Sequence, residues 1–289
     1  MKMSFEKIDS HTTSDRVLVL TMNDPETLNA LGDPLMPELV SEVDRFASDP
    51  DLRALLITGA GRAFSSGANV RTFARGVQER EQELSNESYE APRISPWEQL
   101  DPISHAAETR NYGTGPDIVS KLHNMQKPSF AAVNGHAYGL GCGIALSCDF
   151  RVAGEAARFN EAFIRNGIVP ADGSAWQLPK LVGMSNALWM QMSGEPITGE
   201  EAYRIGLANW LATDDQLMDK TLELATKLAR GPVYAMGIVK QLVHQGYQQS
   251  LVEHLPLASR AQGLTKDTFD HKEGVQAFIE KRQAEYRGY

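Results

Sequence analysis

Hydrophobic and polar positions along this chain follow two different periods. Short, largely apolar runs occupy residues 17–22, 53–58 and 129–133, and such runs are typical of strands that are buried on both faces. Residues 34–47 instead place their apolar side chains at helical spacing. Strand-like and helix-like segments alternate to about residue 210, and only helix-like segments follow. The pattern predicts an α/β core with a helical C-terminal part.

Further elements are expected from the same periodicities. Residues 5–8 favour a strand, residues 118–125 a helix, and residues 144–146 a short helical segment. The later helices are expected at residues 185–192, 200–205, 214–228, 233–245 and 251–282, the last in one or two pieces.

The length of 289 residues exceeds the usual size of a single hydrophobic core, so one large domain with an appended part is expected. We assign residues 1–210 to the α/β core and residues 211–289 to the helical region. Residues 75–110 differ from both because they are acidic and interrupted by prolines. Two interpretations remain for this insertion: a partly ordered lid over a pocket, or an ordinary solvated loop.

Two turns rich in small residues each follow a predicted strand, at residues 59–69 and 134–143. Glycine lets the main chain approach a ligand closely, and the first amides of a following helix have no partner within that helix. Such a turn suits an anion, or an oxygen that becomes anionic during a reaction. Close packing alone is the alternative interpretation. A dinucleotide fingerprint is not indicated, because Gly139, Gly141 and Gly143 do not have its spacing.

Composition excludes several classes of function. A net charge of −9 argues against a nucleic-acid surface, which requires a basic face. Cys142 and Cys148 have no histidine at ligand spacing, so neither a zinc site nor a disulfide framework is expected. No signal-like N-terminus and no apolar run of about 18 residues occurs. We therefore expect a cytoplasmic protein without a metal or a membrane span.

Five sequence blocks carry a family resemblance. They are LNAL at 28–31, GRAFSSGAN at 61–69, KPSFAAVNGHAYGLGCGIALSCD at 127–149, GEEAYRIGLA at 199–208, and KEGVQAFIEKR at 272–282. In this order they resemble the enoyl-CoA hydratase/isomerase (crotonase) superfamily over nearly the whole chain. The resemblance implies a crotonase-like spiral of ββα units, with the C-terminal helices as a trimerisation region. It also implies a homotrimer or a homohexamer.

The ligand class and the site follow from the same resemblance. Family members bind acyl-CoA thioesters and need no cofactor beyond the coenzyme A of the substrate. Two backbone amides hold the thioester carbonyl and stabilise the enolate, and at the matching positions these belong to Ala68 and Leu140. The candidate substrate-binding residues are Ala63, Phe64 and Ser66 beside the CoA adenine, His136 and Tyr138 in the glycine turn, Phe163 and Trp176 at the acyl pocket, and Phe278 and Lys281, which reach the CoA of a neighbouring subunit.

The chain departs from the hydratase pattern at its two catalytic carboxylates. A hydratase needs one carboxylate to activate water and one to manage the α-proton. The matching positions are Gly143 and Phe163, so the two-glutamate mechanism is not implied. Asp172 is the candidate single acid/base, and its alternative role is that of a turn residue capping the next helix. Glu161 is expected to point elsewhere, because two residues on a helix differ by about 200°.

Three functional hypotheses therefore remain. The first is an isomerase-like enzyme that moves a double bond with Asp172 alone. The second is a hydrolase of a β-diketone or a thioester, in which Asp172 orients water. The third is a non-catalytic acyl-CoA-binding protein, consistent with the absence of both glutamates.

Overall fold

The computed structural model describes residues 5–68 and 114–289. Its larger sheet has six strands, in the order β1 (Ile8–Thr12), β2 (Val17–Met22), β3 (Ala54–Gly59), β5 (Ser129–Val133), β7 (Phe150–Ala153) and β10 (Trp210–Leu211). All neighbouring pairs are parallel except β1 and β2. The strand expected at residues 5–8 is therefore wrong in its bounds: it begins only at Ile8, where pairing with Met22 starts.

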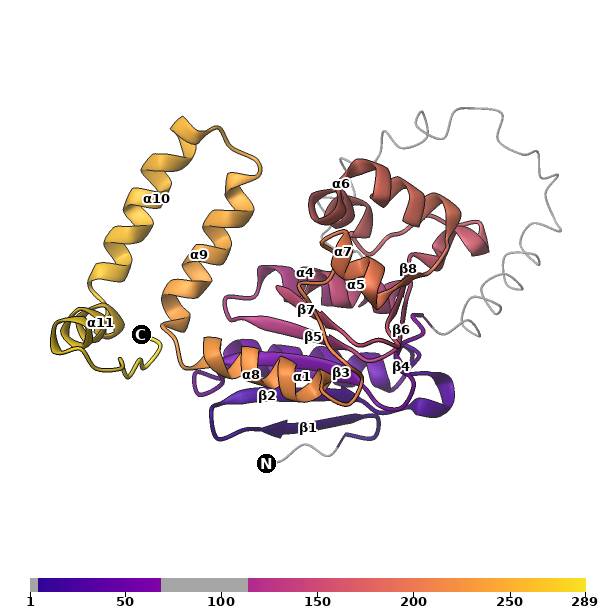
Figure 1. Ribbon diagram of the computed structural model, residues 1–289, viewed down its shortest axis with the longest axis horizontal. Helices are drawn as coiled ribbons and strands as arrows, with labels where there is room; N and C mark the ends of the chain where they lie inside the picture. Colours follow the sequence, from indigo (N-terminus) through magenta and orange to yellow (C-terminus); the bar gives the residue numbers. More distant parts are fainter. Residues whose placement is uncertain (1–4, 69–113) are drawn as a thin grey trace, which may run out of the picture.

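A smaller sheet runs beside the first, in the order β4 (Ala63–Ser65), β6 (His136–Tyr138), β8 (Arg158–Asn160) and β9 (Ile197–Thr198). Each of β4, β6 and β8 directly follows a strand of the larger sheet along the chain, and β6 is in turn followed by a helix. The repeated ββα unit predicted for the chain is thus visible in the element order (Figure 1).

Helices cover both faces of the larger sheet. Leu18, Leu20 and Ile57 belong to the core shared with α1 and α4, whereas Val19 and Leu56 belong to a second core with α8. This alternation follows from the strand geometry, because successive side chains point to opposite faces. The helices, including two short 3-10 segments η1 and η3, are η1 (Pro25–Thr27), α1 (Leu35–Ser48), α4 (Thr114–Asn124), α5 (Leu140–Ser147), η3 (Ala162–Asn166), α6 (Ser174–Ser193), α7 (Gly199–Arg204), α8 (Leu217–Ala229), α9 (Val233–Gly246), α10 (Leu251–Lys266) and α11 (Phe269–Glu280).

The C-terminal helices α9, α10 and α11 extend from the rest of the molecule as an arm (Figure 1). The helical pattern at 251–282 forms two helices, and Thr268 caps the second by accepting a hydrogen bond from the His271 amide at 3.0 Å. The boundary near residue 210 stays a prediction, and α8 beyond it packs against β3 and β5. The insertion at 75–110 lies wholly within residues 69–113, outside the described residues. Across residues 5–68 and 114–289, no helix combines the length and hydropathy that a membrane span requires.

Candidate active site

The two glycine-containing turns meet between β4 and the start of α5. Gly67 follows β4 and has a φ of +87°, a conformation that favours glycine. A Cβ atom at Gly67 would lie 2.5 Å from the Tyr138 carbonyl oxygen and 3.4 Å from the Leu140 amide nitrogen. Only a residue without a side chain lets the chain before Ala68 approach the second turn this closely.

Two backbone amides are consequently brought near each other. Leu140 is the first residue of α5, and the first amides of a helix have no acceptor within it. Its side chain packs toward α4, where a Cβ at Gly115 would lie 3.2 Å from Leu140 Cδ2. Ala68 follows Gly67 directly and forms a parallel bridge with Leu31. The residues predicted as the two amide donors therefore lie on adjoining turns.

The turn at residues 59–69 is held in place by Asn29, the buried asparagine of the LNAL block. Its side-chain Nδ2 donates to the carbonyl oxygens of Ala60 at 3.0 Å and Ala63 at 2.8 Å. Ser65 Oγ donates to the Asn29 carbonyl at 2.8 Å and accepts from the Gly67 amide at 3.1 Å. These bonds connect the LNAL block to the loop that carries Ala68.

The carboxyl group of Asp172 occupies the space beside residue 143. A Cβ at Gly143 would overlap Asp172 Oδ2 and lie 2.9 Å from Asp172 Cγ. The family resemblance places a glutamate at residue 143. Asp172, two residues before α6, fills that space instead. The absence of a side chain at Gly143 is a requirement for this placement.

Each carboxylate oxygen of Asp172 has a different environment. Oδ1 accepts the amide of Ser174 at 3.1 Å, as expected for a residue that shapes the turn into α6. Oδ2 is buried and has no hydrogen-bond partner among the described residues. The turn-forming role and a chemical role are therefore compatible, because each uses a different oxygen.

Glu161 lies in the same buried cluster, and the expectation that it points elsewhere is wrong. Its Oε2 accepts a hydrogen bond from Ser174 Oγ at 2.6 Å, and its Oε1 has no partner among the described residues. The expectation failed because it assumed helical rotation. Glu161 has φ −84° and ψ 66° and precedes the 3-10 helix η3. The one available signal was its place directly after the strand-like residues that form β8 (Arg158–Asn160).

The two carboxyl groups influence each other electrostatically. Burial, and then the charge of Asp172, raise the pKa of Glu161 to about 8. Burial also raises the pKa of Asp172. Cys142, at the start of α5, has a thiol pKa raised well above its ordinary value by burial, so it remains a thiol and contacts Glu161. Two buried carboxyl groups in one cluster, both with raised pKa values, favour a state in which the pair keeps a proton.

The remaining predicted residues divide into two groups. Near the turns, His136 and Tyr138 of β6 are half-buried with their rings 5.0 Å apart, and the Phe163 ring lies 3.7 Å from the Cβ position of Gly139. The side chains of Ala63 and Phe64 are fully buried, so any ligand contact there falls to their backbone.

Ser66 lies in the turn that carries Ala68, but its side chain bonds to another segment, and Phe278 and Lys281 lie far from the turns. Ser66 Oγ donates to the Thr27 carbonyl oxygen at 3.1 Å. Phe278 belongs to α11, and Lys281 ends that helix. Both are at the far end of the C-terminal arm from β4 and β6 (Figure 1), so within one chain they do not join the carboxyl cluster.

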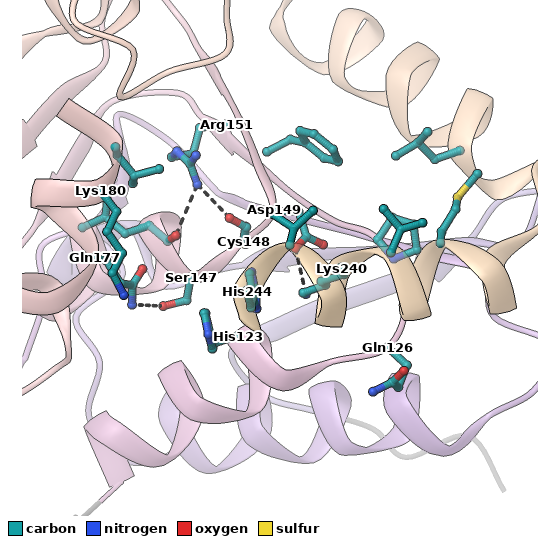
Figure 2. A pocket seen from close by; sticks show the side chains of 18 of the residues that line it. His123, Gln126, Ser147, Cys148, Asp149, Arg151, Gln177, Lys180, Lys240 and His244 are labelled. Carbon is teal, nitrogen blue, oxygen red and sulfur yellow. Dashed lines mark hydrogen bonds and ion pairs between the residues drawn. The ribbon is translucent and has the colours of Figure 1, made fainter. Parts of the chain in front are cut away.

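Trp176 lines a separate pocket of about 660 Å³ between the start of α6 and α9. Figure 2 shows His123 and His244 together in this pocket, where their rings stack 4.1 Å apart. Burial lowers the pKa of His123 to about 4, so this ring is neutral. Asp149 and Lys240 form an ion pair at 2.8 Å across the pocket. Neither Asp172 nor Glu161 lines it.

No metal cluster accompanies the site: within the part of the chain that the structure describes, no three histidine, cysteine or acidic side chains gather as ligands. Both cysteines are free and buried. The arrangement offers two amides, one ionisable carboxylate and one protonated carboxyl group, which suits proton transfer next to an oxygen that gains negative charge.

Comparison with known proteins gives a consistent picture. The sequence model described as enoyl-CoA hydratase/isomerase matches residues 12–94 and 98–289. The chain is 35% identical over 273 residues to the 2,3-dehydroadipyl-CoA hydratase of Escherichia coli (strain K12), covering 94% of this chain and 96% of that protein. It is 30% identical over 272 residues to the 1,2-epoxyphenylacetyl-CoA isomerase of the same organism, covering 94% and 95%.

Solved structures agree in fold. The crystal structure of an enoyl-CoA hydratase from Bacillus anthracis superposes with a TM-score of 0.82 at 26% identity, covering 98% of this chain and 100% of that one. The crystal structure of an enoyl-CoA hydratase subunit I from Geobacillus kaustophilus HTA426 gives a TM-score of 0.79 at 29% identity, covering 99% of each chain. The expected crotonase-like fold with a helical C-terminal part is confirmed. Both a hydratase and an isomerase occur among the relatives, so the choice of reaction depends on the site.

Proposed function

Because this chain belongs to the enoyl-CoA hydratase/isomerase family, we propose that it shifts a carbon–carbon double bond in an acyl-CoA thioester, with Asp172 as the single acid/base. The observation that carries the proposal is the Asp172 carboxyl group above Gly143, with Oδ2 buried and unpartnered within the described residues. Asp172 thereby takes the place of the side chain that a hydratase carries at residue 143.

The amides of Ala68 and Leu140 form the oxyanion hole in this proposal. Support comes from the adjoining turns, since the Cβ position of Gly67 lies 3.4 Å from the Leu140 amide nitrogen. A thioester carbonyl held there gains negative charge as the enolate forms. One donor of this kind lowers the barrier by about 3 kcal/mol.

Asp172 alone can remove and return the proton that this reaction moves. The Asp172 carboxylate removes a proton from one carbon of the acyl chain: the C–H bond breaks, an O–H bond forms, and the electron pair moves onto the thioester oxygen as an enolate. Asp172 then returns the proton to a different carbon, the enolate collapses, and the double bond occupies its new position. No water is consumed and no group leaves, so a second carboxylate for water activation is not needed.

The proposal includes no cofactor other than the coenzyme A of the substrate, a homotrimeric or homohexameric assembly, and a cytoplasmic location. The cofactor and assembly proposals follow from the family and not from a feature of the site, and the location stays the expectation stated from the sequence.

The test compares wild-type protein with Asp172→Asn on a panel of 2-enoyl-CoA and 3-enoyl-CoA thioesters. Nuclear magnetic resonance follows the position of the double bond, and a thiol reagent follows free CoA. We expect double-bond migration without CoA release, and a loss of at least about 100-fold in kcat for Asp172→Asn. Asp117→Asn is the matched control, because Asp117 is exposed on α4 and its contact with Lys121 is long, at 3.9 Å.

Three outcomes contradict the proposal. Unchanged turnover in Asp172→Asn removes the assigned acid/base. Release of free CoA or of a cleaved acid by the wild type indicates the hydrolase hypothesis. Binding of acyl-CoA with no turnover across the panel indicates a non-catalytic binding protein.

A further inference from the structure

Glu161 is a buried carboxyl group for which the proposed reaction has no role. Its side chain is buried in the protein interior. It lies near Asp172, as shown by Ser174, which forms a hydrogen bond with each of the two carboxyl groups. The Ser174 amide donates to Asp172 Oδ1, and the Ser174 hydroxyl donates to Glu161 Oε2. Ser174 therefore holds one oxygen of each carboxyl group and leaves Asp172 Oδ2 and Glu161 Oε1 unpartnered among the described residues.

Among the described residues, no cation compensates the charge of the pair. The groups that act on Glu161 are Asp172, the hydroxyl of Ser174, and the thiol of Cys142 on α5. Neither carboxyl group forms an ion pair within residues 5–68 and 114–289. Two negative charges in one buried site without a cation repel strongly, so the pair favours a state with one proton.

We propose, on the basis of the acyl-CoA activity argued above, that Glu161 is a positioning residue that holds the single proton of a Glu161–Asp172 pair and so keeps Asp172 as a carboxylate with Oδ2 free for the substrate. Ser174 keeps the two carboxyl groups in this arrangement. The division of roles follows from their environments: Glu161 is enclosed by Ser174 and Cys142, whereas Asp172 lies above Gly143 beside the turn of Leu140.

The arrangement has a measurable consequence at alkaline pH. The pKa of Glu161 is about 8 in the folded protein, so the residue is neutral below that pH and negative above it. Once Glu161 loses its proton, the enolate must form beside a second buried negative charge, which raises the barrier. We expect kcat/KM to fall as the pH rises through about 8.

Glu161→Gln tests this directly, because glutamine is permanently neutral and retains an acceptor for the Ser174 hydroxyl. The variant is expected to remain active at pH 7 and to lose the alkaline fall in kcat/KM. Glu42→Gln is the matched control: Glu42 is also buried, but it is bonded to Arg45 at 2.7 Å on α1. Its alkaline profile should equal that of the wild type.

A second pair of variants changes the proton affinity of Glu161 without removing it. The neighbouring Cys142 thiol lowers the pKa of Glu161, so Cys142→Ala should move the alkaline fall to higher pH. Cys142→Ser retains a donor and should restore the wild-type profile. A structural role for Glu161 would instead lower activity at all pH values and leave the position of the fall unchanged.

Infrared spectroscopy supplies a readout that needs no turnover. The wild type should show a protonated-carboxyl band that disappears with a midpoint near pH 8 and is missing in Glu161→Gln. In Asp172→Asn the midpoint should move to lower pH, because the charge of Asp172 helps to raise the pKa of Glu161. An unchanged alkaline fall in Glu161→Gln, or no such band in the wild type, overturns the inference. If Asp172→Asn keeps full activity while the wild type shows the band, the proposed reaction is overturned instead. The inference that the pair holds a proton is then unaffected.

Discussion

At residue 143 the absence of a side chain leaves room for the carboxyl group of Asp172. Gly143 lies within α5, where alanine would ordinarily be favoured over glycine by about 1 kcal/mol. Here the added methyl group would overlap Asp172 Oδ2, so the usual preference is reversed. A single methyl group therefore determines both the packing of α5 and the position of the proposed acid/base.

Gly143→Ala is expected to lower the free energy of unfolding by about 1–3 kcal/mol, the usual effect of overpacking a core. It should also lower kcat, because Asp172 must move away. Urea unfolding and a turnover assay measure the two effects. Gly263→Ala is the control, since nothing lies within 4 Å of a Cβ at this position in α10 and the change should stabilise the helix. Equal stabilisation of both variants would contradict the steric argument.

At the scale of the element, the LNAL block acts through Asn29, whose side chain joins this block to residues 60–64. Asn29 is fully buried with a φ of +56°, and its amide donates to the carbonyls of Ala60 and Ala63. A buried acceptor left without its donor costs about 1–3 kcal/mol. The side chain therefore holds residues 60–64, which lead through β4 into the loop that carries Ala68.

We expect Asn29→Ala to destabilise the protein by about 2–3 kcal/mol and to lower kcat more than it raises KM, since the loop that carries Ala68 loses its support. Asn29→Asp keeps the shape but not the donor and should behave similarly. Asn124→Ala serves as the control, because that side chain bonds only within α4, to Ser120. Urea unfolding and steady-state kinetics provide the measurements. Wild-type kinetics in Asn29→Ala would show that the loop holds its place without the asparagine.

The sequence predicted an element correctly where the element depends on residues that are close together in the chain. The buried strands at residues 17–22, 54–59 and 129–133 depend on local composition, so one sequence was sufficient for them. The start of α5 was predicted wrongly: the helix begins at Leu140, within the expected glycine turn and before the helical segment expected at residues 144–146. Glu161 was missed because its orientation depends on a 3-10 helix that begins one residue later, and apolar spacing does not distinguish this from an α-helix. Trp176 and His123 line a pocket that is closed by α9, a helix more than 50 residues away from both along the chain. Local sequence patterns do not predict such a contact.

At the scale of the whole molecule, the C-terminal arm exposes apolar side chains that a single chain leaves uncovered. On α10 these include Val252 and Leu255, and on α11 Phe278 and Ile279, with Phe278 87% exposed. Exposed apolar patches of this kind mark interaction surfaces. The same arm carries Phe278 and Lys281, the two predicted substrate-binding residues that lie far from the carboxyl cluster (Figure 1). Self-association would explain both observations: a neighbouring copy of the chain would cover the apolar side chains, and its CoA would be the one that Phe278 and Lys281 reach.

We propose that Phe278 lies in a contact between copies of the chain and also reaches the neighbouring CoA. On this proposal, Phe278→Asp is expected to weaken self-association and to raise KM for an acyl-CoA thioester. Multi-angle light scattering measures the mass, and steady-state kinetics measures KM. His271→Asp, on an exposed position of the same helix, should change neither. A wild-type protein that is monomeric at assay concentration would remove the neighbouring-copy explanation. A variant that keeps its mass but gains a higher KM would instead limit Phe278 to the CoA contact, and would separate assembly from substrate binding along the arm.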